Sequence, residues 1–144
     1  MRLELGPQPV HGADAMHALG QRLARQVGAG DVIALVGDLG AGKTTLIRGL
    51  CAGLGIAPEH VSSPTFALCN LYDAPDLQIA HMDLYRLESL DDLAAAGLDE
   101  WLAAPDALCL IEWPEIARSA LPPTTIWLHL SMIPGGRLVV QREA

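Results

Sequence analysis

The stretch GDLGAGKTTL, residues 37–46, contains the only lysine of the chain, Lys43, whereas the other eight basic residues are all arginines. Residues Gly37 to Thr44 match the pattern G-x-x-x-x-G-K-[ST], whose glycines let backbone N–H groups converge on a polyphosphate. A lysine reaches phosphate oxygens as a slim point charge, which the broad planar guanidinium of arginine cannot do inside a tight loop. Thr44 offers a hydroxyl to Mg²⁺. This spacing predicts a nucleoside-triphosphate site.

A phosphate loop of this kind needs a second carboxylate for the metal or its waters, and two acids end apolar runs. The run LCLIE ends at Glu112, and the run LQIAHMD ends at Asp83. Both acids are expected at the carboxyl edge of a sheet, where open α/β folds bind ligands. Glu112 fits better, because its run is uninterrupted and Trp113-Pro114 ends it. Either acid could instead cap a loop, or both could serve, one on Mg²⁺ and the other on a water.

Hydroxyl groups gather in SSPTF, where Ser62, Ser63 and Thr65 surround a proline. Nucleotide switches often place a γ-phosphate sensor after the phosphate-loop helix, although an ordinary turn has the same composition. Asp38, inside the phosphate loop, would repel a γ-phosphate if it pointed inward. We therefore expect its carboxylate to point away or to order water.

Several other side chains near these motifs have two interpretations. His81 is two residues from Asp83 on the same strand face, but a lone histidine is more often structural than catalytic. Arg86 could be an internal arginine finger, and a surface pairing with Glu88 is the favoured alternative. Trp113 and Trp127 are expected in the core, although an indole beside the site could border a purine.

Composition limits the class of protein. With 144 residues, of which 51% are hydrophobic, the chain is predicted to be one globular domain spanning 1–144. It has no apolar run of membrane-spanning length and no apolar stretch of signal-peptide length at its start, so we expect a cytoplasmic protein. Cys51, Cys69 and Cys109 are odd in number and far apart, which favours reduced core thiols. A net charge of −8 without a basic run argues against binding DNA or tRNA directly.

Apolar periodicity predicts alternating strands and helices. Strands are expected at 3–5, 31–37, 66–72, 77–85, 107–113 and in a closing hairpin of 124–133 and 137–143. Helices are expected at 13–27, 43–54 and 88–103, the last broken at Gly97. This order predicts an α/β fold of the P-loop NTPase type, with three layers, a largely parallel central sheet and added antiparallel strands.

Four segments, GDLGAGKTTLIRGL, SSPTFALCNLY, HMDLYRL and CLIEWPE, occur in this order and resemble the TsaE (YjeE) family. The resemblance extends over nearly the whole chain, from HALGQRLA to the final hairpin. Family members are bacterial P-loop ATPases required to make threonylcarbamoyladenosine in tRNA. The resemblance therefore implies a P-loop α/β core with extra antiparallel strands.

The resemblance also implies roles for particular residues. ATP and Mg²⁺ are the implied cofactors, with Thr44 and Glu112 holding the metal. Asp83 would lie at the same centre, Thr65 on the switch-like loop, and Ala13 and Gly136-Arg137 beside the base. Residues expected to contact the nucleotide are Ala13, Leu39, Gly40, Ala41, Gly42, Lys43, Thr44, Thr45, Trp113 and Gly136, and those expected to act in hydrolysis are Asp83, Glu112, Thr65 and Lys43. The family often has threonine where this chain has Met16.

The implied mode of action is indirect. The family hydrolyses ATP to reset a partner complex of the TsaD and TsaB type, without transferring the threonylcarbamoyl group itself, and touches tRNA only through those partners. Two alternatives remain open. One is a small-metabolite kinase, which would need a lid carrying several arginines. The other is a regulatory module that binds nucleotide without turnover.

Overall fold

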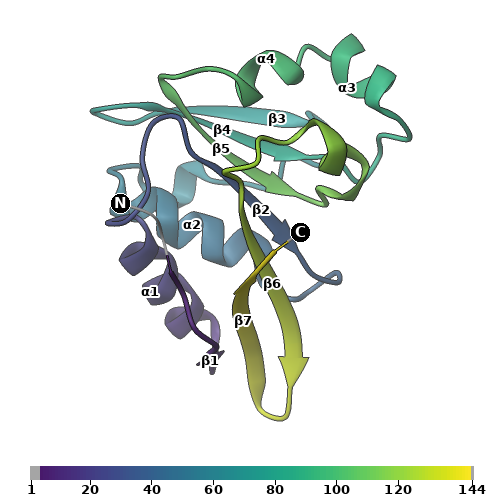
Figure 1. Ribbon diagram of the computed structural model, residues 1–144. Coiled ribbons are helices and arrows are strands. Elements are labelled where there is room, and N and C mark those ends of the chain that lie inside the picture. Colours follow the sequence, from purple (N-terminus) through teal and green to yellow (C-terminus); the bar gives the residue numbers. More distant parts are fainter. Residues whose placement is uncertain (1–3, 144) are drawn as a thin grey trace.

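The computed structural model describes residues 4–143 and contains one seven-stranded sheet flanked by helices (Figure 1). The strands are β1 (Gln8–Val10), β2 (Val32–Val36), β3 (Cys69–Asp73), β4 (Gln78–Asp83), β5 (Ala107–Glu112), β6 (Ile126–Ile133) and β7 (Gly136–Arg142). The helices are α1 (Ala13–Leu23), α2 (Lys43–Gly53), α3 (Leu90–Ala95) and α4 (Asp99–Leu102), with short 3₁₀ segments η1 (Pro58–His60) and η2 (Glu115–Ala120).

The sheet has a parallel centre with antiparallel margins. The strand order is β1-β7-β6-β2-β5-β4-β3, and β6, β2, β5 and β4 are mutually parallel. β3 pairs antiparallel with β4, β7 with β6, and β1 with β7. Continuous apolar sequences form the central strands because both of their faces are covered. The predicted α/β fold class with a largely parallel centre is confirmed.

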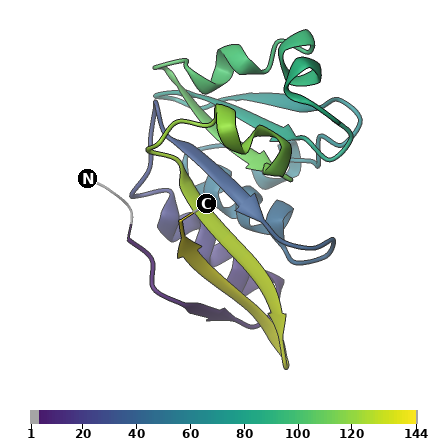
Figure 2. The same cartoon turned by 45° about the vertical axis from the view of Figure 1, so that its right-hand side comes forward.

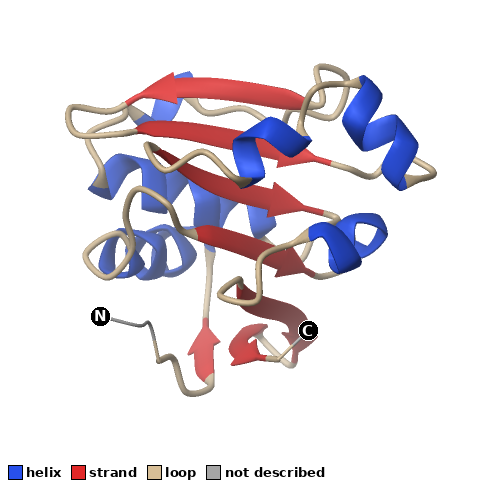
Figure 3. Ribbon diagram, turned by 45° about the horizontal axis from the view of Figure 1, so that its top comes forward, coloured by secondary structure: helices blue, strands red, loops and turns tan. Residues whose placement is uncertain are grey.

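Two apolar clusters form the core on opposite faces of the sheet. Helices α1 and α2 pack on one face, where Leu19 and Leu46 meet residues such as Leu35 and Leu110. The other face is covered by α3, α4 and η2, with Leu93 packed near Met82. Figure 2 and Figure 3 show these layers, with the parallel strands running in one direction between the two groups of helices. The predicted three-layer arrangement is confirmed.

The first strand lies later in the chain than predicted. Of the expected strand at 3–5, Leu3 lies outside the described residues, and Glu4 and Leu5 are not in a strand. β1 instead pairs with β7 at the margin of the sheet. An edge position tolerates Pro9, which lacks an N–H to donate to a neighbouring strand.

Other boundaries follow the sequence prediction with small changes. α1 ends at Leu23, four residues before the expected end, and the helical segment after β4 is broken at Gly97, which has φ +74°. The closing hairpin is formed by β6 and β7. All three cysteines are free, and burial raises the pKa of the Cys51 and Cys109 thiols to about 12 and that of Cys69 to about 11. Within residues 4–143, every helix is too short or too polar to cross a bilayer.

Candidate functional site

The segment of residues 37–44, which the sequence predicts to be a phosphate loop and which keeps that name below, connects the end of β2 to the start of α2. Gly40 and Gly42 have φ of +80° and +101°, which side-chain-bearing residues rarely adopt. The segment therefore makes a tight turn, and the N-terminus of α2 follows directly after it. Unpaired N–H groups and the positive end of the helix dipole at this point suit an anion. The predicted glycine-rich turn between a strand and a helix is present.

Lys43 lies beneath an indole ring. Its side chain is 5% exposed, its Nζ donates to the Gly37 carbonyl, and the same atom lies 3.4 Å from the centroid of the Trp113 ring. Burial lowers the pKa of Lys43, and the carboxylates of Glu112, Glu115, Asp83 and Asp38 oppose that shift. The ammonium is thus held by a carbonyl and an aromatic face.

Trp113 is not the core residue that the sequence suggested. It is half-buried, and its φ of 54° belongs to the left-handed region, which bulky residues avoid. This turn at the end of β5 carries the indole over Lys43, where the Tyr85 ring packs against it with centroids 4.8 Å apart. Backbone strain of this kind concentrates at functional sites. Trp127, by contrast, is buried as expected.

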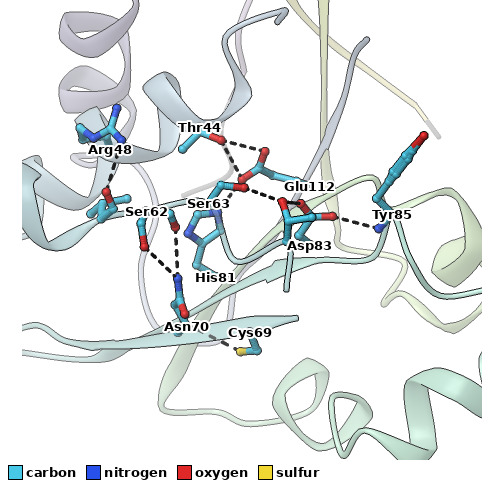
Figure 4. Close-up of polar contacts among 12 residues, drawn as sticks. Thr44, Arg48, Ser62, Ser63, Cys69, Asn70, His81, Asp83, Tyr85 and Glu112 are labelled. Carbon is cyan, nitrogen blue, oxygen red and sulfur yellow. Dashed lines mark hydrogen bonds and ion pairs between the residues drawn. The ribbon is translucent and has the colours of Figure 1, made fainter. Parts of the chain in front are cut away.

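The two predicted acids lie side by side at the carboxyl edge of the sheet. Asp83 and Glu112 are register partners at the ends of the parallel strands β4 and β5. Each is 3% exposed. The Thr44 hydroxyl donates to the Glu112 carboxylate, with its Oγ1 3.0 Å from Oε1 and 3.2 Å from Oε2 (Figure 4). The strand-end carboxylate and the phosphate-loop hydroxyl therefore meet, although 68 residues separate them in sequence.

The loop of residues 61–65 contacts Asp83, the other strand-end acid. Thr65 Oγ1 donates to Asp83 Oδ2 at 3.0 Å and lies 2.9 Å from Ser63 Oγ. The other Asp83 oxygen, Oδ1, accepts from the Tyr85 N–H at 2.9 Å. In the described part of the chain no hydrogen bond joins Ser62 to either carboxylate, and its carbonyl and hydroxyl oxygens accept from Asn70 Nδ2 (Figure 4). Of the three predicted hydroxyl residues, Thr65 contacts an acid directly.

A cavity of about 380 Å³ opens beside the phosphate loop. Its lining residues are Gly12, Ala13, Met16, Gly40, Gly42, Thr45, Gly135, Gly136 and Arg137. They come from the start of α1, the phosphate loop and the β6–β7 turn, so the cavity joins three segments that are distant in sequence. Its volume falls in the range of small-molecule sites.

Some residues named from the sequence lie elsewhere. The Leu39 side chain is 85% exposed and the Ala41 side chain is buried, so only their backbone can face a phosphate. Asp38 is exposed and lines a different hollow with His129 and Ser131, which agrees with the expectation that it points away.

The favoured pairing of Arg86 with Glu88 is wrong. The Arg86 guanidinium lies 5.2 Å from the Phe66 ring centroid, and the one salt bridge found within residues 4–143 joins His81 and Glu112. Phe66 immediately follows the 61–65 loop, and its ring is the partner of Arg86 in place of the expected Glu88 carboxylate. Within residues 4–143, no hydrogen bond or salt bridge joins Arg86 to Asp83 or Glu112, so its interpretation as an arginine finger is not supported by a contact.

A family model described as "Threonylcarbamoyl adenosine biosynthesis protein TsaE" matches residues 10–138. This chain belongs to the TsaE family. Relatives named tRNA threonylcarbamoyladenosine biosynthesis protein TsaE from Borreliella burgdorferi and Treponema pallidum are 38% and 40% identical over 111 and 117 residues. These alignments cover 76% and 81% of this chain and 80% and 84% of the relatives. The crystal structure of Bacillus subtilis YdiB matches with a TM-score of 0.76 and 28% identity, covering 98% of this chain and 86% of that one.

The donor set at the TsaE-type site has the chemistry of a magnesium site. Thr44, Glu112 and Asp83 bring only oxygen ligands, and within residues 4–143 no group of three or more His, Cys, Asp and Glu side chains could hold a metal alone. Mg²⁺ is commonly held by one or two carboxylates together with substrate phosphates. The residues present therefore fit a magnesium ion that arrives with a nucleotide.

Sequence reasoning missed three contributors to this TsaE-type site. Gly12 and Gly135 line the cavity, and both have positive φ, of 92° and 78°. A glycine in such a place could have been suspected only from its position before a helix or in a hairpin turn. Tyr72 contacts His81, and no pattern in the sequence points to it. Met16 lines the cavity and is 2% exposed.

Proposed function

We propose that this protein binds ATP with Mg²⁺ and hydrolyses it as the ATPase of tRNA threonylcarbamoyladenosine biosynthesis. The observation that carries the proposal is the contact of the Thr44 hydroxyl with Glu112, at the N-terminus of α2. A phosphate loop whose threonine meets a strand-end carboxylate is the arrangement that P-loop NTPases use for a metal-bound triphosphate. Membership of the TsaE family supplies the pathway.

In this proposal the two ends of the nucleotide are held by different means. Backbone N–H groups of the phosphate loop and Lys43 bind the phosphates, and Thr44 and Glu112 hold Mg²⁺. The cavity beside Ala13 and Gly136 receives the base. Its walls are mostly glycine and backbone, which leaves room for a flat aromatic ring recognised mainly by its shape. Mg²⁺, when bound, neutralises charge that develops on the phosphates.

Asp83 is the residue proposed to orient the attacking water. Both of its oxygens already accept one hydrogen bond, from Thr65 and from the Tyr85 N–H, which fixes the carboxylate in place. Each carboxylate oxygen keeps a further lone pair for a water. That water would attack the γ-phosphorus, the bond to the bridging oxygen would break, and ADP, phosphate and a proton would leave.

A role in resetting a partner complex is supported by the surface around the site. Leu39, Phe66 and Tyr85 are 85%, 85% and 61% exposed, and they come from the phosphate loop, the segment before β3 and the segment after β4. Large apolar side chains exposed on segments around a site are typical of a protein–protein contact. We propose a TsaD–TsaB type complex as the partner, with tRNA reached only through it.

A kinase reading gains no support from the arginines. Arg48 donates to the Val61 carbonyl, Arg118 lies over the Trp127 ring, and Arg137 donates to the Gly40 carbonyl. These guanidinium groups serve separate places, whereas a kinase lid needs several converging on the transferred phosphate.

The decisive experiment is an ATPase assay on four mixtures: the protein alone, with the partner complex, with tRNA, and with both. We expect slow Mg²⁺-dependent hydrolysis alone and a large stimulation by the partner complex. Absence of ATP binding in a calorimetric titration, together with no hydrolysis in any mixture, would contradict the proposal. Transfer of the γ-phosphate to a small molecule in a cell extract would favour a kinase instead.

A further inference from the structure

His81 is a buried side chain that the proposed hydrolysis does not use directly. It is 0% exposed, in the middle stretch of β4, and both of its ring nitrogens face polar groups. Nε2 lies 2.7 Å from Glu112 Oε2, and Nδ1 lies 3.0 Å from the Tyr72 hydroxyl oxygen. The imidazole therefore stands between the candidate magnesium site and the edge strand β3.

Strand register explains how one ring reaches both partners. Across β3–β4 the residue opposite His81 is Asn70, and across β4–β5 it is Leu110. Tyr72 and Glu112 each lie two positions from these partners, so they are diagonal neighbours of His81. Side chains two positions apart on a strand share a face, and diagonal pairs are within reach of aromatic and long side chains.

The contacts continue beyond both partners. The Tyr72 hydroxyl oxygen also lies 3.3 Å from the carbonyl oxygen of Ser62. At the other end, Glu112 accepts the hydroxyl of Thr44. An unbroken series of contacts, here termed the Tyr72–His81 link, thus connects the 61–65 loop to the phosphate loop through the interior of the sheet.

We propose that Tyr72 and His81 are positioning residues for the ATPase reaction. The Tyr72–His81 link holds the Glu112 carboxylate in one orientation toward the metal and ties that orientation to the position of the 61–65 loop. This inference rests on the proposed function and adds to it two residues that do not touch the nucleotide.

The need for such a residue follows from the geometry of Glu112. The terminal torsion of a glutamate is broad and nearly two-fold, so the two oxygens are easily exchanged. Thr44 does not distinguish them, because its Oγ1 lies 3.0 Å from one oxygen and 3.2 Å from the other. His81 contacts Oε2 alone, and since a carboxylate accepts only, Nε2 donates. That contact leaves Oε1 to face the phosphate loop, as partners outside the ligand shell commonly do at metal sites.

The 61–65 loop is coupled to both carboxylates because it contacts each of them by a separate route. The same 61–65 loop reaches Asp83 through Thr65 and reaches Glu112 through Ser62, Tyr72 and His81. A shift of this loop therefore changes the surroundings of both carboxylates together.

Three substitutions separate the parts of the link. His81→Leu removes both nitrogens at similar volume, His81→Gln keeps a donor near the Nε2 position, and Tyr72→Phe removes a single hydroxyl. The matched controls are His129→Leu and His129→Gln on β6, where Nε2 is buried without a hydrogen-bond partner among residues 4–143. Each variant is measured for kcat and KM with ATP and for its thermal unfolding midpoint. The affinity for Mn²⁺ with a nonhydrolysable ATP analogue is measured by electron paramagnetic resonance.

We expect His81→Leu to lower kcat and Mn²⁺ affinity by about 10- to 100-fold, with little change in the KM for ATP. His81→Gln should recover Mn²⁺ affinity but not the full kcat. Tyr72→Phe should lower kcat about fivefold, the loss of one neutral hydrogen bond. Because both single changes break the same link, the kcat of the double variant His81→Gln with Tyr72→Phe should be no lower than that of the more impaired single variant. The His129 controls should match wild type in kcat and Mn²⁺ affinity.

Wild-type Mn²⁺ affinity in a folded His81→Leu protein would overturn the positioning role. If that variant does not fold, Tyr72→Phe and the double variant decide, because unchanged kcat or additive losses would overturn the coupling. Binding of ATP and Mn²⁺ to the wild-type protein is measured before any variant is made. A wild-type protein that binds neither would contradict the proposed function itself.

Discussion

The candidate site is built in two ways on its two sides. On the side of β4 and β5, which we term the polar half, it consists of two hydrogen-bonded groups, Thr44–Glu112–His81 and Thr65–Asp83, with distances of 2.7 to 3.2 Å. On the side of α1 and the β6–β7 turn, which we term the glycine half, it consists mainly of Gly12, Ala13, Gly135 and Gly136 around a cavity. One half presents functional groups, and the other presents a shape.

This difference predicts different responses to substitution. In the polar half the identity of a side chain decides the chemistry, so isolated changes should alter turnover more than ATP affinity. In the glycine half the absence of a side chain leaves room for the ligand, so an added Cβ should alter binding and packing.

The largest effect is expected for Glu112→Ala. Loss of the metal-holding carboxylate should remove several kcal/mol of transition-state stabilisation and lower kcat about 1,000-fold, while ATP affinity is largely retained. Steady-state hydrolysis and a binding titration measure the two quantities. Glu115→Ala is the control, because Glu115 is an exposed acid near Lys43 that makes no hydrogen bond to Thr44. Normal hydrolysis by Glu112→Ala would remove Glu112 from the proposed metal site.

Lys43→Ala should act on binding. Charge-assisted hydrogen bonds are worth about 1.5–3 kcal/mol each, so we expect ATP affinity to fall about 100-fold. Calorimetric titration measures the change. Lys43→Arg sharpens the test, since it keeps the charge but not the slim shape, and it should also bind poorly. Unchanged affinity in the alanine variant would refute the phosphate-loop assignment.

A smaller effect is expected for Thr65→Ala, which removes one of the two donors that hold Asp83. Losing a hydrogen bond to a charged group should lower kcat about tenfold. Thr65→Ser retains the hydroxyl and should stay close to wild type, which separates the hydrogen bond from the shape of the loop. Equal turnover of the alanine and serine variants would leave Thr65 without a part in the reaction.

The smallest effect tests the glycine half. In Gly136→Ala the new Cβ would meet the Val10 carbonyl oxygen at 2.4 Å, so β1 must shift. We expect a loss of about 1 kcal/mol in the free energy of unfolding and a matching decrease in ATP affinity, with kcat unchanged at saturation. Gly28→Ala is the control, because its Cβ would have nothing within 4 Å. A fall in kcat without a change in affinity would break the division between the two halves.

Sequence reasoning predicted those features that depend on neighbours in the chain. The glycine spacing in residues 37–44 predicted the turn between β2 and α2, because a tight turn before a helix needs glycines at particular positions. Apolar runs identified β2 and β5, because a strand covered on both faces must be apolar throughout. The family resemblance was also confirmed, and it too depended on neighbours in the chain, because it rested on short motifs in a fixed order.

Only the tertiary structure decided which distant side chains meet. The family resemblance had implied that Thr44 and Glu112 share a metal, but the structure shows that they contact each other directly. The structure also shows that Thr65 contacts Asp83 and that Trp113 lies over Lys43 instead of in the core. The physical reason is that strand order and register bring together residues that are tens of positions apart, and a change of one position in register would turn each side chain to the opposite face. Chain-local patterns contain no record of that pairing.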